Sequence, residues 1–379
     1  MSNDAIRLVK LTVLGSVAVL PLLILPTMVG ALVDYADFSE SAAGWVASAG
    51  FAGGAGAAIL LALRIRHLDP QKLALAGLIT IAIADSLSAL ATKMPLPVFL
   101  GLRVVSGVGG ATAYAAVMAT IAASAMPERG YGIFSVFQFA LSAVGLYVLP
   151  LVLPDIGVIG MYLGLAAAAV LAIPLFGSVL TRERTAVSTD PAIEIHMLLK
   201  PAAILAMLGI GLYEAANTMH FTYAERIGVS FGLADYRIGE ILGIATVVGI
   251  PAAFAAAWLG NRFGDLLPIM ATLLLSIAAL VVLTLYSGQG VYTLSMCALG
   301  IAWAFGLPFF QSVEARLDPG GSIVVAGGFF TSGGGALGPA IAATLVGGQG
   351  YAAVLICAMG IYVVVAGIMT VCLRLIPRH

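Results

Sequence analysis

Residues 210–221 read Ile-Gly-Leu-Tyr-Glu-Ala-Ala-Asn-Thr-Met-His-Phe, which places an acid, an amide and an imidazole inside an apolar run that begins near Pro201. On a helix with 100° per residue, five polar side chains fall within roughly 160° of one face: Tyr213, Glu214, Asn217, Thr218 and His220. In a bilayer such a face cannot point at lipid. It must face protein or a water-filled cavity.

Composition indicates an integral membrane protein. The 379 residues are 61% hydrophobic and only 9% charged, and the mean hydropathy is +1.09, whereas soluble domains usually carry about 25% charged residues. The net charge of −1 leaves no basic surface for nucleic acid. The cysteines Cys297, Cys357 and Cys372 lack metal-binding spacing, and no metal or cofactor is predicted.

A membrane-spanning helix needs roughly 20 apolar residues. Cutting the chain at its polar breaks predicts twelve spans, at about 8–33, 42–63, 73–92, 96–125, 131–153, 157–180, 200–224, 236–259, 266–287, 290–315, 322–347 and 351–375. The predicted fold class is an all-α membrane protein with two pseudo-symmetric six-helix bundles. The predicted domains are an N-terminal bundle at 1–180, a cytoplasmic linker at 181–199 and a C-terminal bundle at 200–379.

Lysine and arginine predict the orientation. With both termini in the cytoplasm, thirteen of these side chains fall on the cytoplasmic side, three outside, and Arg103 within a span. We expect a multi-pass protein of a bacterial cytoplasmic membrane, surrounded by lipid and working as a monomer.

The two halves repeat weakly. Pro127 follows the fourth span and Pro319 follows the tenth, 192 residues later. Two six-helix repeats are typical of secondary transporters.

Three stretches resemble motifs of the major facilitator superfamily: residues 38–44 at the start of the second span, 102–111 with Arg103 in the fourth, and 260–265 between the eighth and ninth. The corresponding first-half loop, 64–70, keeps only the basic character of that motif. The resemblance covers the whole chain. It implies two bundles that rock about a central site, with spans 1, 4, 7 and 10 lining the cavity.

Small residues and prolines predict where helices approach or break. Glycines such as Gly107 and Gly334 indicate close helix packing rather than ligand binding. Five prolines are expected to break regular helix locally and to bend it at the cavity or at the seam between the bundles, where the freed carbonyls are covered: Pro21, Pro26, Pro251, Pro308 and Pro339.

Glu214 is the leading functional residue. It lies about fourteen residues into the seventh span, roughly 20 Å along the helix and near the bilayer centre. A carboxyl group there suits proton coupling and solute binding, because it exchanges its proton only when water or solute reaches it. The alternative is a permanently protonated acid that is hydrogen-bonded to a neighbouring helix.

The neighbours of Glu214 leave alternatives open. Asn217 is predicted to bind solute, with a helix–helix clasp equally compatible, and Tyr213 belongs to the same predicted solute site. His220 is a candidate proton relay, because imidazole titrates near physiological pH, or else a packing residue.

Asp85 and Arg103 lie about nine residues either side of the turn near Pro95, so an antiparallel hairpin brings them to similar depth. We predict a buried ion pair. A free Arg103 facing the cavity would instead favour an anionic solute. The match of Arg103 to the fourth-span motif implies a role for the pair in proton translocation.

Further side chains are weaker candidates. Tyr114, Gln138 and Gln311 are predicted to contribute to solute binding, as are the aromatic residues Trp303, Phe305 and Phe309, for which packing is the commoner role. Glu314 and Arg316 are predicted to form a gate or a surface contact at the cytoplasmic end of the tenth span.

These residues predict a proton-coupled secondary transporter for a small organic solute, not an enzyme. No nucleotide-binding Gly-x4-Gly-Lys-Ser/Thr motif is present. The fifth span lacks the Gly-x3-Gly-Pro motif of the family's drug/proton antiporters, which favours symport. The few cations in the spans favour a monocarboxylate or another small, partly apolar metabolite. The alternatives are a proton-driven exporter of amphipathic drugs and a membrane enzyme or sensor on the same fold.

Overall fold

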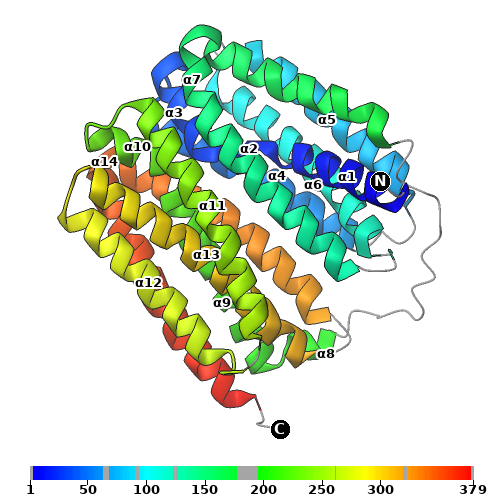
Figure 1. The fold of residues 1–379 in the computed structure, drawn as a ribbon, viewed down its shortest axis with the longest axis vertical. Coiled ribbons are helices and arrows are strands. Elements are labelled where there is room, and N and C mark those ends of the chain that lie inside the picture. Colours follow the sequence, from blue (N-terminus) through cyan, green and yellow to red (C-terminus); the bar gives the residue numbers. More distant parts are fainter. Residues whose placement is uncertain are drawn as a thin grey trace. The chain divides into compact units, whose positions relative to one another are not determined.

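The computed structural model describes residues 3–62, 68–90, 94–122, 124, 127–176, 195–260, 262–318 and 322–376. These residues are almost all helical, apart from short connections, and no strand occurs among them (Figure 1). The greater part of the predicted linker, 181–194, and the basic loop at 64–67 lie outside the described residues.

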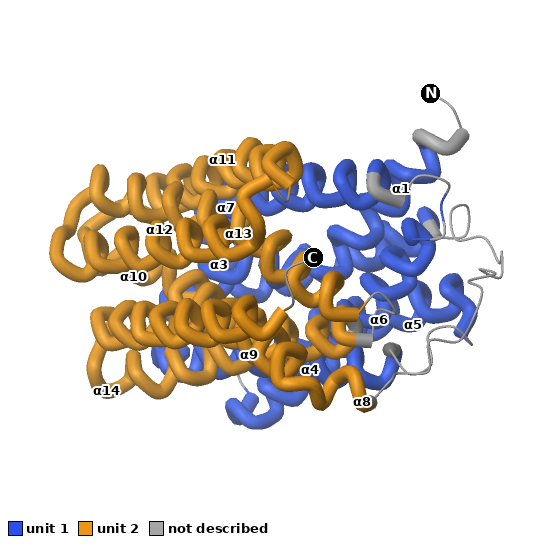
Figure 2. The backbone as a smooth tube through the Cα atoms, turned by 90° about the horizontal axis from the view of Figure 1, so that it is seen from below, with its two compact units in different colours: residues 1–187 blue, residues 188–379 orange. Residues whose placement is uncertain are grey.

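The chain divides into two compact units, residues 1–187 and 188–379, which Figure 2 shows in different colours. The helices of the first unit are α1 (Asn3–Ala18), α2 (Leu20–Leu23), α3 (Leu25–Ala36), α4 (Glu40–Ala62), α5 (Pro70–Leu90), α6 (Leu96–Ala122) and α7 (Pro127–Phe176). Those of the second are α8 (Ile195–Leu198), α9 (Pro201–Thr222), α10 (Ala224–Ser230), α11 (Asp235–Leu259), α12 (Leu266–Leu285), α13 (Gln289–Leu317) and α14 (Ser322–Leu375).

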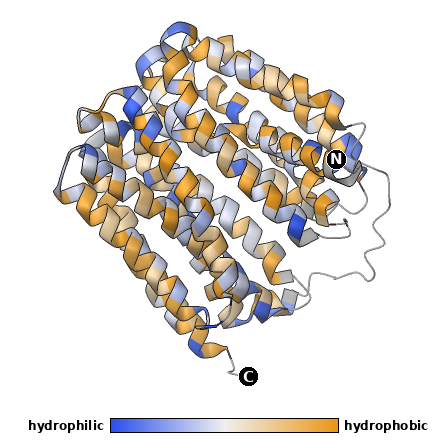
Figure 3. Ribbon diagram, in the orientation of Figure 1, coloured by the Kyte–Doolittle hydropathy of each residue, from blue (hydrophilic) through white to orange (hydrophobic). Residues whose placement is uncertain are grey.

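Within the described ranges, nine helices are long and apolar enough to cross a membrane. Apolar residues run along the whole length of these helices (Figure 3). Two of the nine, α7 and α14, each consist of two helices joined at a glycine with positive φ, Gly157 (φ 60°) and Gly350 (φ 73°). Only glycine adopts this backbone conformation readily. Gly157 and Gly350 lie at the predicted boundaries between spans. The number of twelve spans and the cytoplasmic location of both termini stay predictions.

The predicted first span is broken twice. The chain leaves helical geometry at Val19 and at Ile24, and these breaks accompany Pro21 and Pro26, which lack the N–H needed to continue the helix. The hydroxyl group of Ser142 in α7 donates to the carbonyl of Leu23 at 2.6 Å. A protein donor therefore covers backbone that a bilayer would leave unsatisfied.

The other three prolines lie within continuous helices. Pro251, Pro308 and Pro339 are inside α11, α13 and α14 without ending them. A proline inside a helix removes one backbone N–H and favours a bend. The predicted bends at these three positions stay predictions.

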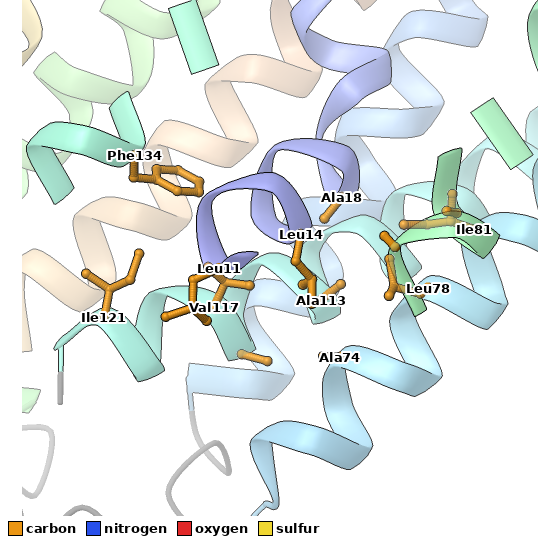
Figure 4. Packing of buried hydrophobic residues seen from close by; sticks show 13 residues of the cluster. Leu11, Leu14, Ala18, Ala74, Leu78, Ile81, Ala113, Val117, Ile121 and Phe134 are labelled. Carbon is orange, nitrogen blue, oxygen red and sulfur yellow. The ribbon is translucent and has the colours of Figure 1, made fainter. Parts of the chain in front are cut away.

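The core of the first unit is built around α1. Leu11 and Leu14 pack in one buried cluster with Val117 of α6, Leu78 of α5 and Phe134 of α7 (Figure 4). Each of these side chains is at most 4% exposed. The cluster fixes α5, α6 and α7 around the first helix.

Glycine controls how closely the helices approach, as predicted. A Cβ atom built on Gly107 of α6 would overlap the backbone of Gly50 in α4, and one on Gly334 of α14 would overlap the backbone of Gly211 in α9. The second contact holds the first part of α14 directly against α9, the helix that carries Glu214. Gly333, the neighbour of Gly334, has open space around its Cβ position.

We expect Gly334→Ala to destabilise the protein by about 1–3 kcal/mol, because the added methyl group must push α14 away from α9. The thermal unfolding temperature in detergent measures this effect. The matched control is Gly333→Ala, which should leave that temperature unchanged or slightly higher. Equal losses for both variants would contradict the close contact.

Candidate functional site

Glu214 lies in the middle of α9, on a helix that is enclosed by protein. All side chains from Tyr213 to His220 are buried, and Glu214 itself is 7% exposed. The helix begins after Lys200, whose extended backbone precedes Pro201 at the first helical position, where a missing N–H costs nothing. The polar face predicted from the sequence therefore does not point at lipid.

The carboxyl group of Glu214 has a neutral partner. The indole Nε1–H of Trp303 in α13 donates to Glu214 Oε1 at 3.1 Å. No ion pair joins Glu214 to a cation within the described ranges. Trp303 is 36% exposed, so part of the side chain that contacts this acid lies at the surface of the structure.

One helical turn further along α9, three side chains form a hydrogen-bonded chain. The hydroxyl group of Tyr362, in the second half of α14, donates to Asn217 Oδ1 at 2.9 Å. The same hydroxyl oxygen lies 3.2 Å from His220 Nε2. A hydroxyl group has one proton, so when it donates to Asn217 the imidazole must donate through Nε2–H. The chain thus runs from His220 through Tyr362 to Asn217.

The nitrogen of the Asn217 amide also has a partner: Nδ2 donates to the carbonyl of Tyr213 at 2.9 Å. In this state Asn217 clasps α9 to α14, and a solute that binds the amide must first displace Tyr362. Tyr213 is fully buried. Its ring stacks on Phe310 of α13 with centroids 4.4 Å apart, which is a packing contact.

The predicted ion pair is present in the first unit. Arg103 Nη2 donates to Asp85 Oδ1 at 2.7 Å, and the two side chains are 4% and 0% exposed. Three hydroxyl and aromatic groups complete the site. Ser88 Oγ accepts from Arg103 Nη2 at 2.5 Å, Ser106 Oγ donates to Asp85 Oδ1 at 2.9 Å, and the guanidinium carbon lies 4.6 Å from the ring centroid of Tyr162. Arg103 is therefore engaged with protein.

The remaining candidates lie apart from these two clusters. Tyr114 is half-buried, and its ring packs edge-on against Phe134 with the ring centroids 5.7 Å apart. Gln138 is half-buried on α7. Gln311 is exposed on α13. In the part of the chain that the structure describes, no three His, Cys, Asp or Glu side chains are grouped so as to hold a metal ion.

Tyr362 was missed from the sequence, although a signal was present. A hydroxyl group inside the apolar run 351–375 needs a partner when it is buried. The same reasoning applies to Ser88 and Ser106 beside the ion pair. Which partner each one finds depends on helix rotation, which periodicity does not supply.

The Major Facilitator Superfamily model matches residues 11–343. The chain belongs to this family. It is therefore a multi-pass membrane protein and a secondary transporter of a small-molecule solute rather than an enzyme. No curated protein sequence matches the chain significantly.

Solved structures of other transporters share the fold. A point variant of the nucleoside transporter NupG is 14% identical, with a TM-score of 0.81, and the match covers 96% of this chain and 99% of that one. A bacterial homologue of the human lysosomal transporter Spinster is 13% identical, with a TM-score of 0.78 and coverage of 99% and 98%. The human organic anion transporter MFSD10 is 17% identical, with a TM-score of 0.69 and coverage of 97% and 100%.

We expect Tyr362→Phe to destabilise the protein by about 1–3 kcal/mol, because Asn217 and His220 lose a buried hydrogen-bond partner. Thermal unfolding in detergent is the measurement. Tyr286→Phe, at an exposed tyrosine that follows α12, is the control and should have no effect. If Tyr362→Phe behaves like this control, the hydroxyl group does not hold the chain together.

Asp85→Leu should cost about 3–5 kcal/mol, since it leaves the guanidinium group of Arg103 buried without its counter-ion. The double variant Asp85→Leu/Arg103→Met should recover most of that loss. The exposed pair of Arg237 and Glu240, 2.6 Å apart, provides the control, and Glu240→Gln should leave the unfolding temperature unchanged. A double variant as unstable as the single one would argue against pairing as the reason for the loss.

Proposed function

We propose that this family member is a proton-coupled symporter of a small organic solute and that Glu214 is its proton site. The observation that carries the proposal is the enclosed carboxyl group of Glu214, whose partner is the neutral indole of Trp303. An ionised carboxylate without a cation is costly in such surroundings, so the acid binds a proton whenever it is sealed from water. It releases that proton when the site opens.

The solute class follows from the charges available. Arg103 is bound to Asp85, Ser88 and a backbone carbonyl, so in this state it does not offer its charge to an anion. A monocarboxylate, the class that the sequence favours, would meet the carboxyl group of Glu214, and two carboxylates at close range repel. Proton binding to Glu214 removes the repulsion and converts it into a hydrogen bond. We infer that a monocarboxylate enters only together with a proton.

The second candidate is a proton-driven exporter of amphipathic cations. It is favoured by the partly exposed ring of Trp303 beside an acid, since a cation can pair with the carboxylate and lie against the indole. In this case solute and proton compete for Glu214 and move in opposite directions. The two functions therefore differ in the sign of the proton flux.

Three further parts of the proposal come from the sequence. We propose six-helix bundles at 1–180 and 200–379 with a linker at 181–199, rocking in alternating access. We also propose a monomer in a bacterial cytoplasmic membrane with both termini inside. The excess of lysine and arginine assigned to that side supports the orientation.

Proteoliposomes test the coupling. With an acidic outside and a difference of one pH unit, one-to-one symport should accumulate a slowly permeating radiolabelled monocarboxylate such as lactate about tenfold, at a rate well above that of protein-free liposomes. Glu214→Gln should abolish accumulation while exchange at equal concentrations persists, because the amide cannot carry the proton. Efflux of tetraphenylphosphonium loaded inside the vesicles tests the alternative, proton-driven export.

Glu240→Gln is the matched control, since it removes an exposed acid on α11 and should leave accumulation intact. A pH dependence that survives Glu214→Gln would remove this residue from the mechanism. Export would replace symport if tetraphenylphosphonium leaves the vesicles as protons enter and if the protein adds nothing to the accumulation of any carboxylate in a panel from acetate to benzoate.

A further inference from the structure

Glu314 is the least exposed of the acids that the second unit buries with Glu214. Glu314 lies three residues before the end of α13 and is 2% exposed. Its Oε1 atom is buried and has no hydrogen-bond partner among the described residues. The sequence suggested a gate or a surface contact here, but this carboxyl group is enclosed.

The carboxyl group of Glu314 is enclosed because a glycine faces it. A Cβ atom built on Gly327 of α14 would overlap both carboxyl oxygens of Glu314. Any other residue at position 327 would have to displace the acid. The first part of α14 therefore covers the carboxyl group.

The charged groups nearby are engaged elsewhere. On the same helix, Arg316 pairs with Asp265 at the start of α12 at 2.7 Å. Asp318 accepts the backbone N–H of Ile323 at 3.2 Å.

The other elements packed against α13 bring few ionisable groups to this end. These groups are Lys200 before α9, Arg262 after α11 and Arg374 near the end of α14, with Asp265 on α12 already paired. Within the described ranges, no ion pair or hydrogen bond joins any of them to Glu314. A carboxylate at position 314 would thus be buried without compensation, which is far costlier than the neutral acid.

Glu314 shares a helix face with the partner of Glu214. Trp303, Leu307, Phe310 and Glu314 are spaced four, three and four residues apart, which is one stripe of α13. Trp303 contacts Glu214 and Phe310 stacks on Tyr213, so this stripe faces α9. Glu314 lies eleven residues beyond Trp303, roughly 16 Å along the helix.

We propose that Glu314 is a second proton-binding site, which holds a proton while α14 covers it and exchanges that proton when α13 and α14 separate. The part it plays in transport rests on the proposed proton coupling. The bound proton in the covered state does not, and it is tested on the resting protein without any solute.

Infrared spectroscopy of the purified full chain at pH 7 is the test, because protonated carboxyl groups and carboxylates absorb at different frequencies. The difference spectrum between the parent and Glu314→Gln should show the loss of one protonated carboxyl band. Glu240→Gln, at an exposed acid paired with Arg237, should show the loss of a carboxylate band instead. Loss of a carboxylate band in Glu314→Gln would overturn the proposal.

Two further variants keep the test decisive. Glu314→Asp retains a carboxyl group, so it should shift the protonated band rather than remove it, and it serves if the glutamine variant does not fold. Gly327→Ala should also shift that band, because the added methyl group displaces the acid. An unchanged transport phenotype of Glu214→Gln would count against the coupling mechanism but would leave this spectral result standing.

Discussion

The cost of placing a charge or an unpaired polar group away from water governs this structure. In a lipid-facing protein, each acid, base, amide and hydroxyl group must find its partner on another helix or on its own backbone. Asp85 and Arg103 satisfy this requirement as opposite charges. Asn217, Tyr362 and His220 satisfy it as neutral groups in series. Glu214 satisfies it only in part, with a single indole donor.

Close helix contacts make these partnerships possible. The first half of α14 lies against α9 where Gly334 meets the backbone of Gly211, and the second half lies against it where Tyr362 reaches Asn217. Hydrophobicity does not drive such contacts in a bilayer, because lipid is as apolar as a leucine side chain. Small residues therefore fix the distance between helices, and the polar groups fix their rotation. In the contact between Glu314 and Gly327, the glycine sets how closely α14 approaches α13, and the acid is the polar group that α14 covers.

The sequence predicted what depends on composition and spacing along one helix. The membrane class, the buried position of Glu214 and the pairing of Asp85 with Arg103 follow from apolar runs and from depths counted across one hairpin. From the sequence, Trp303 is a packing or solute-binding residue and Tyr362 has no predicted role. Their partners lie 89 and 145 residues away, and periodicity does not encode the rotation of one helix against another. The local breaks predicted at Pro21 and Pro26 are confirmed, because each of these prolines follows a residue that leaves helical geometry.

The glycine turns inside α7 and α14 occupy equivalent places in the two halves of the chain. Gly157 and Gly350 have nearly the same backbone geometry, each reverses the chain without a loop, and they lie 193 residues apart. The prolines after α6 and α13 show almost the same offset, at 192 residues. Two unrelated halves would have no reason to keep one register at both places. The matching offsets mark a repeat, in which the first half carries the pair of Asp85 and Arg103 and the second half carries Glu214 and Glu314.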